Sequence, residues 1–134
     1  MKVYVAGQLR DTQAVRAVQR EIEHAGHTLT HDWTHDLELS DGYADQPARS
    51  ARSAEIARTD LSGVMTADAV VVLASSAEPG RGLFVELGAA LARAELGRLD
   101  HVVVVGEIVH ESVFHFHPRV RRVRAVDEWL ADVS

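Results

Sequence analysis

Residues 67–74 read Ala-Asp-Ala-Val-Val-Val-Leu-Ala, and residues 80–92 read Gly-Arg-Gly-Leu-Phe-Val-Glu-Leu-Gly-Ala-Ala-Leu-Ala. The first stretch carries an apolar run with no polar alternation, which is typical of a strand covered on both faces. The second has the apolar pattern of a helix that begins after a Gly-x-Gly turn. A buried strand followed at once by a helix is the repeating unit of an α/β protein with a parallel sheet.

The same alternation extends over the rest of the chain. Further short strands are expected at 2–6, 27–30, 101–105 and 120–124, and further helices from a cap at Asp11 to Gly26, from Pro47 to about Met65, and over 127–131. Strands that alternate with helices form parallel sheets through right-handed crossovers. We therefore expect one α/β domain over residues 1–134, with a doubly wound, flavodoxin- or Rossmann-like sheet of about five parallel strands and helices on both faces.

The composition narrows the class of partner. The chain has 134 residues, which suits a single domain, and a formal net charge of −6, which argues against nucleic acid polymers as partners. It has no cysteine and no apolar stretch near the roughly 20 residues that a membrane helix needs. We expect a cytoplasmic protein with no membrane association.

Glu86 is the one acidic residue among the apolar residues of 80–92. A carboxylate on such a helix lies inside the protein or lines a cavity, and leaving it unpaired there costs several kcal/mol. Gly80 and Gly82 precede it and let a ligand approach the amides at the helix N-terminus. The sequence therefore predicts an anion beside a ligand-sized gap, with a buried ion pair to an arginine as the alternative.

Asp60 is a second carboxylate at a core-facing helix position. It lies four residues after Ile56 and four before Val64, so helical spacing puts it on their face. Because ligands gather at the carboxyl ends of parallel strands, we expect Asp60 and Glu86 to share one pocket. Two carboxylates can divide the work of cleaving a glycosidic bond. The alternative is that Asp60 pairs with Arg58 or caps a turn.

These stretches resemble a known family. Residues 58–73 read Arg-Thr-Asp-Leu-Ser-Gly-Val-Met-Thr-Ala-Asp-Ala-Val-Val-Val-Leu, and residues 3–10 read Val-Tyr-Val-Ala-Gly-Gln-Leu-Arg. Together with residues 80–91, these stretches are similar to the nucleoside 2-deoxyribosyltransferases. That family includes deoxynucleoside monophosphate N-glycosidases. The resemblance implies that Glu86 attacks the sugar C1′, that Asp60 contacts the substrate and that Tyr4 assists the nucleophile. Water or a second base then takes the sugar. It also implies a homodimer or larger homo-oligomer, for which the helix faces at Ile56 and Leu87 are candidate contact surfaces.

The chemistry suits an ionised nucleophile. Positive charge builds on the sugar as an N-glycosidic bond breaks, so a carboxylate in a dry pocket stabilises the transition state. A covalent glycosyl intermediate would divide the reaction into two easier steps. We therefore expect a low or ordinary pKa for Glu86 rather than the raised pKa of a general acid.

The resemblance also supplies candidate substrate-binding residues. The first loop of the monophosphate hydrolases resembles Gly-Ser-x-Arg, and its counterpart here is Gly7, Gln8, Leu9 and Arg10, with glutamine in place of serine. Arg10, Ser75 and the amides of Gly80 and Gly82 could hold one phosphate. The alternative for Arg10 is a solvated side chain, and the choice between nucleoside and monophosphate stays open.

Two further readings concern Trp33 and the reaction type. Trp33 could stack on a base near the mouth of the pocket, with packing in the core or in a dimer as the alternative. No C-terminal counterpart of the transferases' asparagine or carboxylate is visible, so we favour hydrolysis slightly over transfer. The rival functional class is a non-catalytic nucleotide-binding module of the same fold. A larger glycosidic substrate, such as a dinucleotide cofactor, would need a longer pocket.

We expect neither a metal nor another cofactor. His31 and His35 stand four apart beside Asp32 and Asp36, and His115 and His117 alternate along a short segment. No firm helix aligns the first pair for a metal, and the family resemblance involves none.

Overall fold

The computed structural model describes residues 1–36, 46–74 and 80–134, with the backbone alone for 46–49. Five parallel strands form one sheet in the order β2-β1-β3-β4-β5. The strands are β1 (Lys2–Ala6), β2 (Thr28–Leu29), β3 (Ala69–Leu73), β4 (His101–Val105) and β5 (Val120–Val123). The expected doubly wound α/β fold is confirmed, with the strand order of flavodoxin-like sheets.

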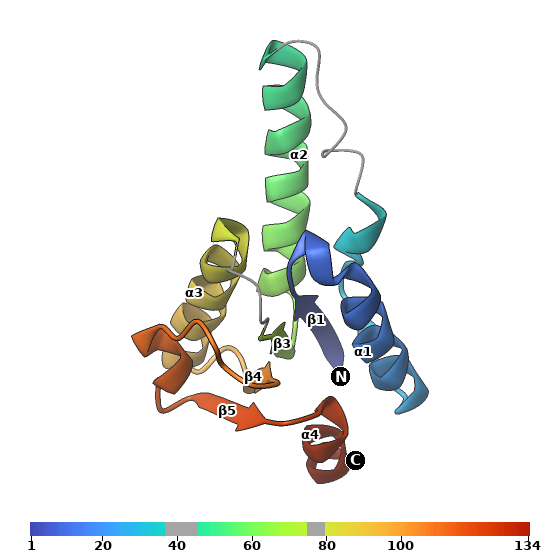
Figure 1. Ribbon diagram of the computed structural model, residues 1–134, viewed down its shortest axis with the longest axis vertical. Helices are drawn as coiled ribbons and strands as arrows, with labels where there is room; N and C mark the ends of the chain where they lie inside the picture. The colour runs from blue at the N-terminus through green and yellow to red at the C-terminus, as the bar shows by residue number, and fades with distance from the viewer. Residues whose placement is uncertain (37–45, 75–79) are drawn as a thin grey trace.

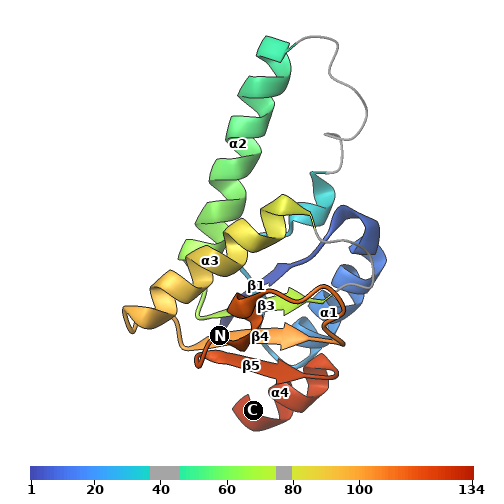
Figure 2. The ribbon, with the colours of Figure 1, turned by 60° about the vertical axis from the view of Figure 1, so that its left-hand side comes forward.

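Helices cover both faces of this sheet. The helices are α1 (Thr12–His24), α2 (Gln46–Met65), α3 (Arg81–Glu95) and α4 (Val126–Val133). Helices α1 and α4 contact each other on one face, and α2 and α3 contact each other on the other (Figure 1). The amino-terminal part of α2 extends well beyond the sheet, as both ribbon views show (Figure 2).

The strands are apolar because helices cover both faces of the sheet. Every residue of β3 is buried, and so are 102–105 of β4 and 3–6 of β1. A strand with a solvated face would alternate polar and apolar residues. The lack of alternation in the sequence was therefore a correct sign of helices on both sides.

The strand order changes direction between β1 and β3, and this places the site. Ala6 pairs with Val72, so β1 and β3 end side by side, with α1 after one strand and α3 after the other. In open α/β sheets, ligands bind outside the carboxyl ends of the strands at such a switch point. The segment after Ala6 and the start of α3 thus meet at the same edge.

The local differences from the sequence expectations are small. Strand β2 has two residues, because only Thr28 and Leu29 pair with β1. Asp11 is the N-cap of α1 without a capping side-chain bond, because residues 9–11 form a 3-10 turn, η1 (Leu9–Asp11), in front of the helix. Within the described residues, two other 3-10 turns, η2 (Trp33–His35) and η4 (Val113–Phe116), were not expected. No helix in the described ranges is both long and apolar enough to cross a membrane.

Candidate active site

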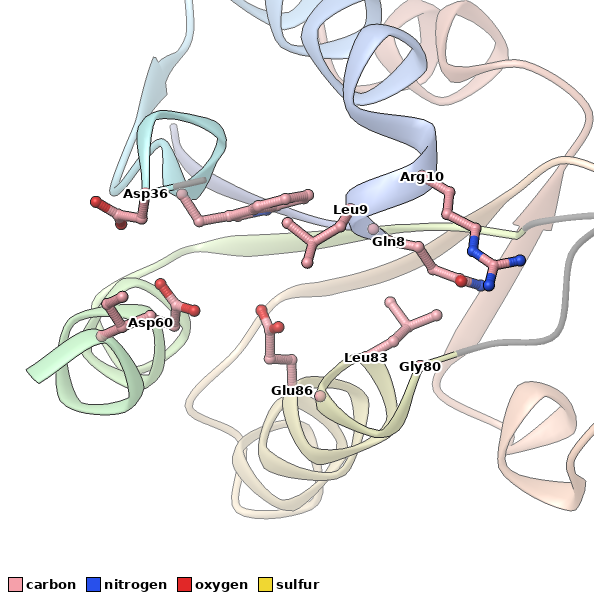
Figure 3. Close-up of a pocket in the computed structure, with 12 residues that line it drawn as sticks. Gln8, Leu9, Arg10, Asp36, Asp60, Gly80, Leu83 and Glu86 are labelled. Atoms are coloured by element: carbon pink, nitrogen blue, oxygen red, sulfur yellow. The ribbon is translucent and has the colours of Figure 1, made fainter. Parts of the chain in front are cut away.

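A cavity of about 400 Å³ opens at the carboxyl ends of β1 and β3 (Figure 3). This volume lies within the range of small-molecule sites. Its walls come from the segment after β1, from η2 and the residue after it, from α2 and from the first turns of α3. The described lining residues are Gly7, Gln8, Leu9, Arg10, Trp33, Asp36, Ile56, Asp60, Gly80, Gly82, Leu83 and Glu86.

Most of the predicted site residues meet here. Glu86, Asp60, Gly7, Gln8, Arg10, Trp33, Gly80 and Gly82 all line the cavity. Tyr4 lies behind the wall and is fully buried. Ser75 falls outside the described residues. The chemical roles of all these residues remain predictions.

Glu86 stands on the second turn of α3 and faces the cavity. Leu83 and Leu87 are buried on either side of it in the sequence and fix the helix against the sheet. The Oε2 atom of Glu86 is buried and has no hydrogen-bond partner within the described ranges. No ion pair joins Glu86 to an arginine of these ranges, so the alternative of an arginine clamp receives no support.

Burial raises the pKa of Glu86 to about 7. The Tyr4 hydroxyl lowers this pKa, and the negative charge of Asp60 raises it further. Our expectation of a low or ordinary pKa was wrong. The cost of removing the carboxylate from water raises the pKa by more than the Tyr4 hydroxyl lowers it. The site holds a carboxylate that is only partly ionised at neutral pH.

Tyr4 on β1 faces Glu86 from inside the core. Burial and the negative charge of Glu86 raise the pKa of its hydroxyl, so the phenol remains protonated and can donate. Its ring lies directly against α2 at Gly63, where an added Cβ would stand 2.7 Å from Tyr4 Cδ2. Sequence reasoning missed Gly63, whose only signal was a glycine inside a predicted helix.

Asp60 shares this end of the cavity with Asp36 (Figure 3). Its Oδ1 lies 3.4 Å from Nε2 of His31, and the same nitrogen lies 3.1 Å from Oδ2 of Asp36. Burial raises the pKa of Asp60, His31 lowers it and Asp36 raises it. The described residues show no pair with Arg58. Sequence reasoning considered His31 only as a metal ligand.

The other end of the cavity carries donors. Arg10 and Gln8 point to this end, near Gly80 (Figure 3). Gln8 is 8% exposed, and its Nε2 has no partner among the described residues. A Cβ at Gly80 or Gly82 would meet nothing within 4 Å, so packing does not demand glycine there. With no capping side chain on α3, its first amides can take an anion.

Gly7 and Trp33 shape the wall between the two ends. A Cβ at Gly7 would clash with Cγ2 of Val15, so glycine lets the end of β1 approach α1. The Trp33 indole donates from Nε1 to the Val5 carbonyl at 2.7 Å and is 8% exposed. Trp33 is thus largely a core residue, and its stacking on a base remains a prediction.

His31, Asp36 and Asp60 offer ligand atoms within 4.8 Å of one another, close enough to hold a cation. The two ion pairs of His31 account for this arrangement without one. His35 pairs with Asp32 instead, at 3.1 Å.

The remaining histidine candidates and Asp68 have structural partners. His115 accepts a hydrogen bond from the Ser112 amide at 3.0 Å, and His117 pairs with Glu95 at 2.8 Å. Asp68 accepts a hydrogen bond from the Lys2 amide at 2.8 Å, which joins the start of β1 to the segment before β3.

Comparison with known proteins adds a family to this geometry. The profile of the nucleoside 2-deoxyribosyltransferase family matches residues 3–104, a span that includes Tyr4, Asp60 and Glu86. No curated protein matches the sequence. The solved structure of the Clostridium botulinum CMP N-glycosidase BcmB is similar, with a TM-score of 0.58 and 14% sequence identity, covering 99% of this chain and 98% of that one. At this identity the likeness supports the fold alone.

Proposed function

Because the chain belongs to the nucleoside 2-deoxyribosyltransferase family, a family of enzymes that act on the bond between a sugar and a base, we propose that it cleaves the N-glycosidic bond of a deoxynucleoside or nucleoside 5′-monophosphate with Glu86 as nucleophile. One observation carries this proposal: Glu86 is a partly buried carboxylate whose buried Oε2 has no hydrogen-bond partner among the described residues, and it lies next to a protonated phenol and lines a cavity of substrate size.

In the proposed first step, a carboxylate oxygen of ionised Glu86 bonds to C1′ and the bond from C1′ to the base nitrogen breaks. The base leaves with the bonding electrons and takes a proton from solvent. Cationic charge builds on the sugar in the transition state of this step, and the negative charges of Glu86 and Asp60 stabilise it. The Tyr4 hydroxyl, which has no hydrogen-bond partner among the described residues, would orient Glu86 by donating to it during the reaction.

In the proposed second step, water attacks C1′ of the glycosyl ester and the ester bond breaks. Glu86 regains its carboxylate, and the proton of the water passes to solvent. Because the nucleophile starts each cycle ionised, the raised pKa of Glu86 limits the reaction below neutral pH.

The polarity of the cavity favours a 5′-monophosphate. Carboxylates gather at the end of Asp60 and Glu86, and donors at the end of Arg10, Gln8 and Gly80. A nucleotide has the matching polarity, with a cationic anomeric carbon in the transition state and an anionic phosphate. The similar structure is that of an enzyme named for CMP, which is such a monophosphate.

Other parts of the proposal rest on the length and composition of the chain and on the family resemblance. We favour hydrolysis slightly over transfer to a second base, in a cytoplasmic homo-oligomer whose single domain spans 1–134. Of the two helix faces suggested as contact surfaces, the face at Ile56 remains a prediction, whereas Leu87 itself is buried within the chain. Leu87 is 1% exposed and belongs to the core, and Ile56 lines the cavity.

The test is a chromatographic assay of base release from a panel of nucleosides and their 5′-monophosphates, with and without a second base as acceptor. We expect free base from at least one deoxy substrate and a loss of essentially all of that rate in Glu86→Ala. Binding of nucleotides without base release would instead indicate the rival class, a nucleotide-binding module. Unchanged base release in Glu86→Ala would eliminate the assigned nucleophile.

A further inference from the structure

His31 lies between two carboxylates at the acidic end of the cavity. Its Nε2 is 3.1 Å from Oδ2 of Asp36 and 3.4 Å from Oδ1 of Asp60. All three side chains are partly buried, with 22% to 25% of each exposed. His31 therefore links Asp36, which follows η2, to Asp60 on α2, at the end of the cavity where Asp60 lies near Glu86.

The backbone around His31 is held firmly against β1 and α2. The Thr30 amide donates to the Val3 carbonyl at 3.0 Å, and the Thr30 hydroxyl donates to the Gly63 carbonyl at 2.8 Å. A Cβ at Gly63 would stand 3.1 Å from the His31 Cβ, so glycine allows this close approach. Gly63 lies about one helical turn after Asp60, and the anchored backbone thus presents the imidazole to that carboxylate.

His31 has a specific electrostatic effect on Asp60. Burial and the charge of Asp36 raise the pKa of Asp60, while His31 lowers it. Arg52 reaches Asp36 at 3.9 Å, and within the described part of the chain His31 is the one basic side chain paired with Asp60. Among the described residues beyond Asp60, the groups that face this cluster are Glu86 on α3 and Tyr4 on β1.

We propose that His31 is a positioning residue that pairs with Asp60 on the side of its Oδ1 and keeps Asp60 ionised beside Glu86. The proposal rests on the proposed function, because the pair acts on a sugar that becomes cationic. Asp60 and Glu86 repel each other, so holding both as anions in a partly dry cavity needs a nearby cation. His31 is the basic side chain placed beside Asp60, and it does not line the cavity.

The first measurement does not depend on catalysis. The carboxyl ¹³C signal of Asp60, assigned with Asp60→Asn, is titrated in the wild type, in His31→Gln and in His31→Asn. Both substitutions retain a hydrogen-bonding amide but cannot carry charge. We expect the Asp60 titration to move upward by about one pH unit in both variants. His35→Gln is the matched control, because His35 also pairs with an aspartate but is 75% exposed and does not line the cavity.

The second measurement is base release as a function of pH. We expect kcat/KM at pH 6 to fall about tenfold in both His31 variants, with the acid limb moved to higher pH, and to stay unchanged in His35→Gln. A wild type that releases no base from any substrate refutes the proposed function, while the Asp60 titration still tests the charge effect.

Three outcomes overturn the role of His31. One is an Asp60 titration and a pH profile that match those of His35→Gln. Another is unfolding of both His31 variants while His35→Gln stays folded, since His31 would then be a structural residue. The third is wild-type activity lost on chelation and restored by Mn²⁺, which would make the three side chains metal ligands.

Discussion

Replacing Glu86 by glutamine should stabilise the protein in a way that depends on pH. Folding moves the pKa of this carboxyl from about 4.5 to about 7. A raised carboxyl pKa means that the native state binds the proton more tightly, so stability is lost as the pH rises through this window. Below pH 4.5 the group is protonated in both states and costs nothing. Above pH 7 the full shift applies, which is about 3 kcal/mol at 1.36 kcal/mol per pH unit.

Glutamine is neutral at every pH, so Glu86→Gln removes this cost. The linkage relation gives a cost of about 1 kcal/mol at pH 5 and about 3 kcal/mol at pH 8. The advantage of the variant should therefore grow by about 2 kcal/mol between these pH values. For a chain of this size this corresponds to a Tm difference that widens by about 7 °C. The change of packing and hydrogen bonding caused by glutamine is the same at both pH values and cancels in this comparison.

The assay is urea unfolding of the wild type and the variant at pH 5 and pH 8. Glu21→Gln is the control, because Glu21 is exposed on α1 outside the cavity. Its stability difference from the wild type should change little with pH. If the difference in unfolding free energy between Glu86→Gln and the wild type stays constant from pH 5 to pH 8, burial does not destabilise the ionised carboxylate and the argument is refuted.

Three further predictions concern catalysis and packing. The kcat/KM of the wild type should fall tenfold per pH unit below about pH 7, since protonated Glu86 cannot attack; a limb near pH 4.5 would contradict this. Arg10→Ala should lower kcat/KM for monophosphates by roughly 10- to 100-fold through loss of a charge-assisted hydrogen bond, with nucleosides nearly unaffected; equal losses on both substrates would place the phosphate elsewhere. Gly63→Ala should lower the rate of base release by about 10²-fold, because its Cβ would stand 2.7 Å from the fully buried Tyr4 ring and displace it. Gly88→Ala is the matched control in a helix, since its Cβ meets nothing within 4 Å, and it should unfold at a slightly higher temperature with unchanged activity.

Sequence patterns were sufficient for the fold and for the identity of the main acidic residues. The apolar run of β3 and the glycine-led helix α3 are local signals, and both elements formed within three residues of the expected bounds. Glu86 was recognisable because its apolar neighbours leave a carboxylate no solvated helix face. Asp60 was recognisable because helical spacing relates it to Ile56 and Val64.

Only the tertiary structure decided the pKa values and the ionisation of these groups. The contact of His31 with Asp60 joins residues far apart in the sequence, and the position of Tyr4 behind Glu86 depends on the missing side chain of Gly63. The pKa of Glu86 follows from how much water the packed elements exclude and from charges on other strands and helices. Periodicity depends on neighbours along the chain and can therefore be identified from the sequence. Burial and electrostatic energies depend on distances that exist only after the chain has folded.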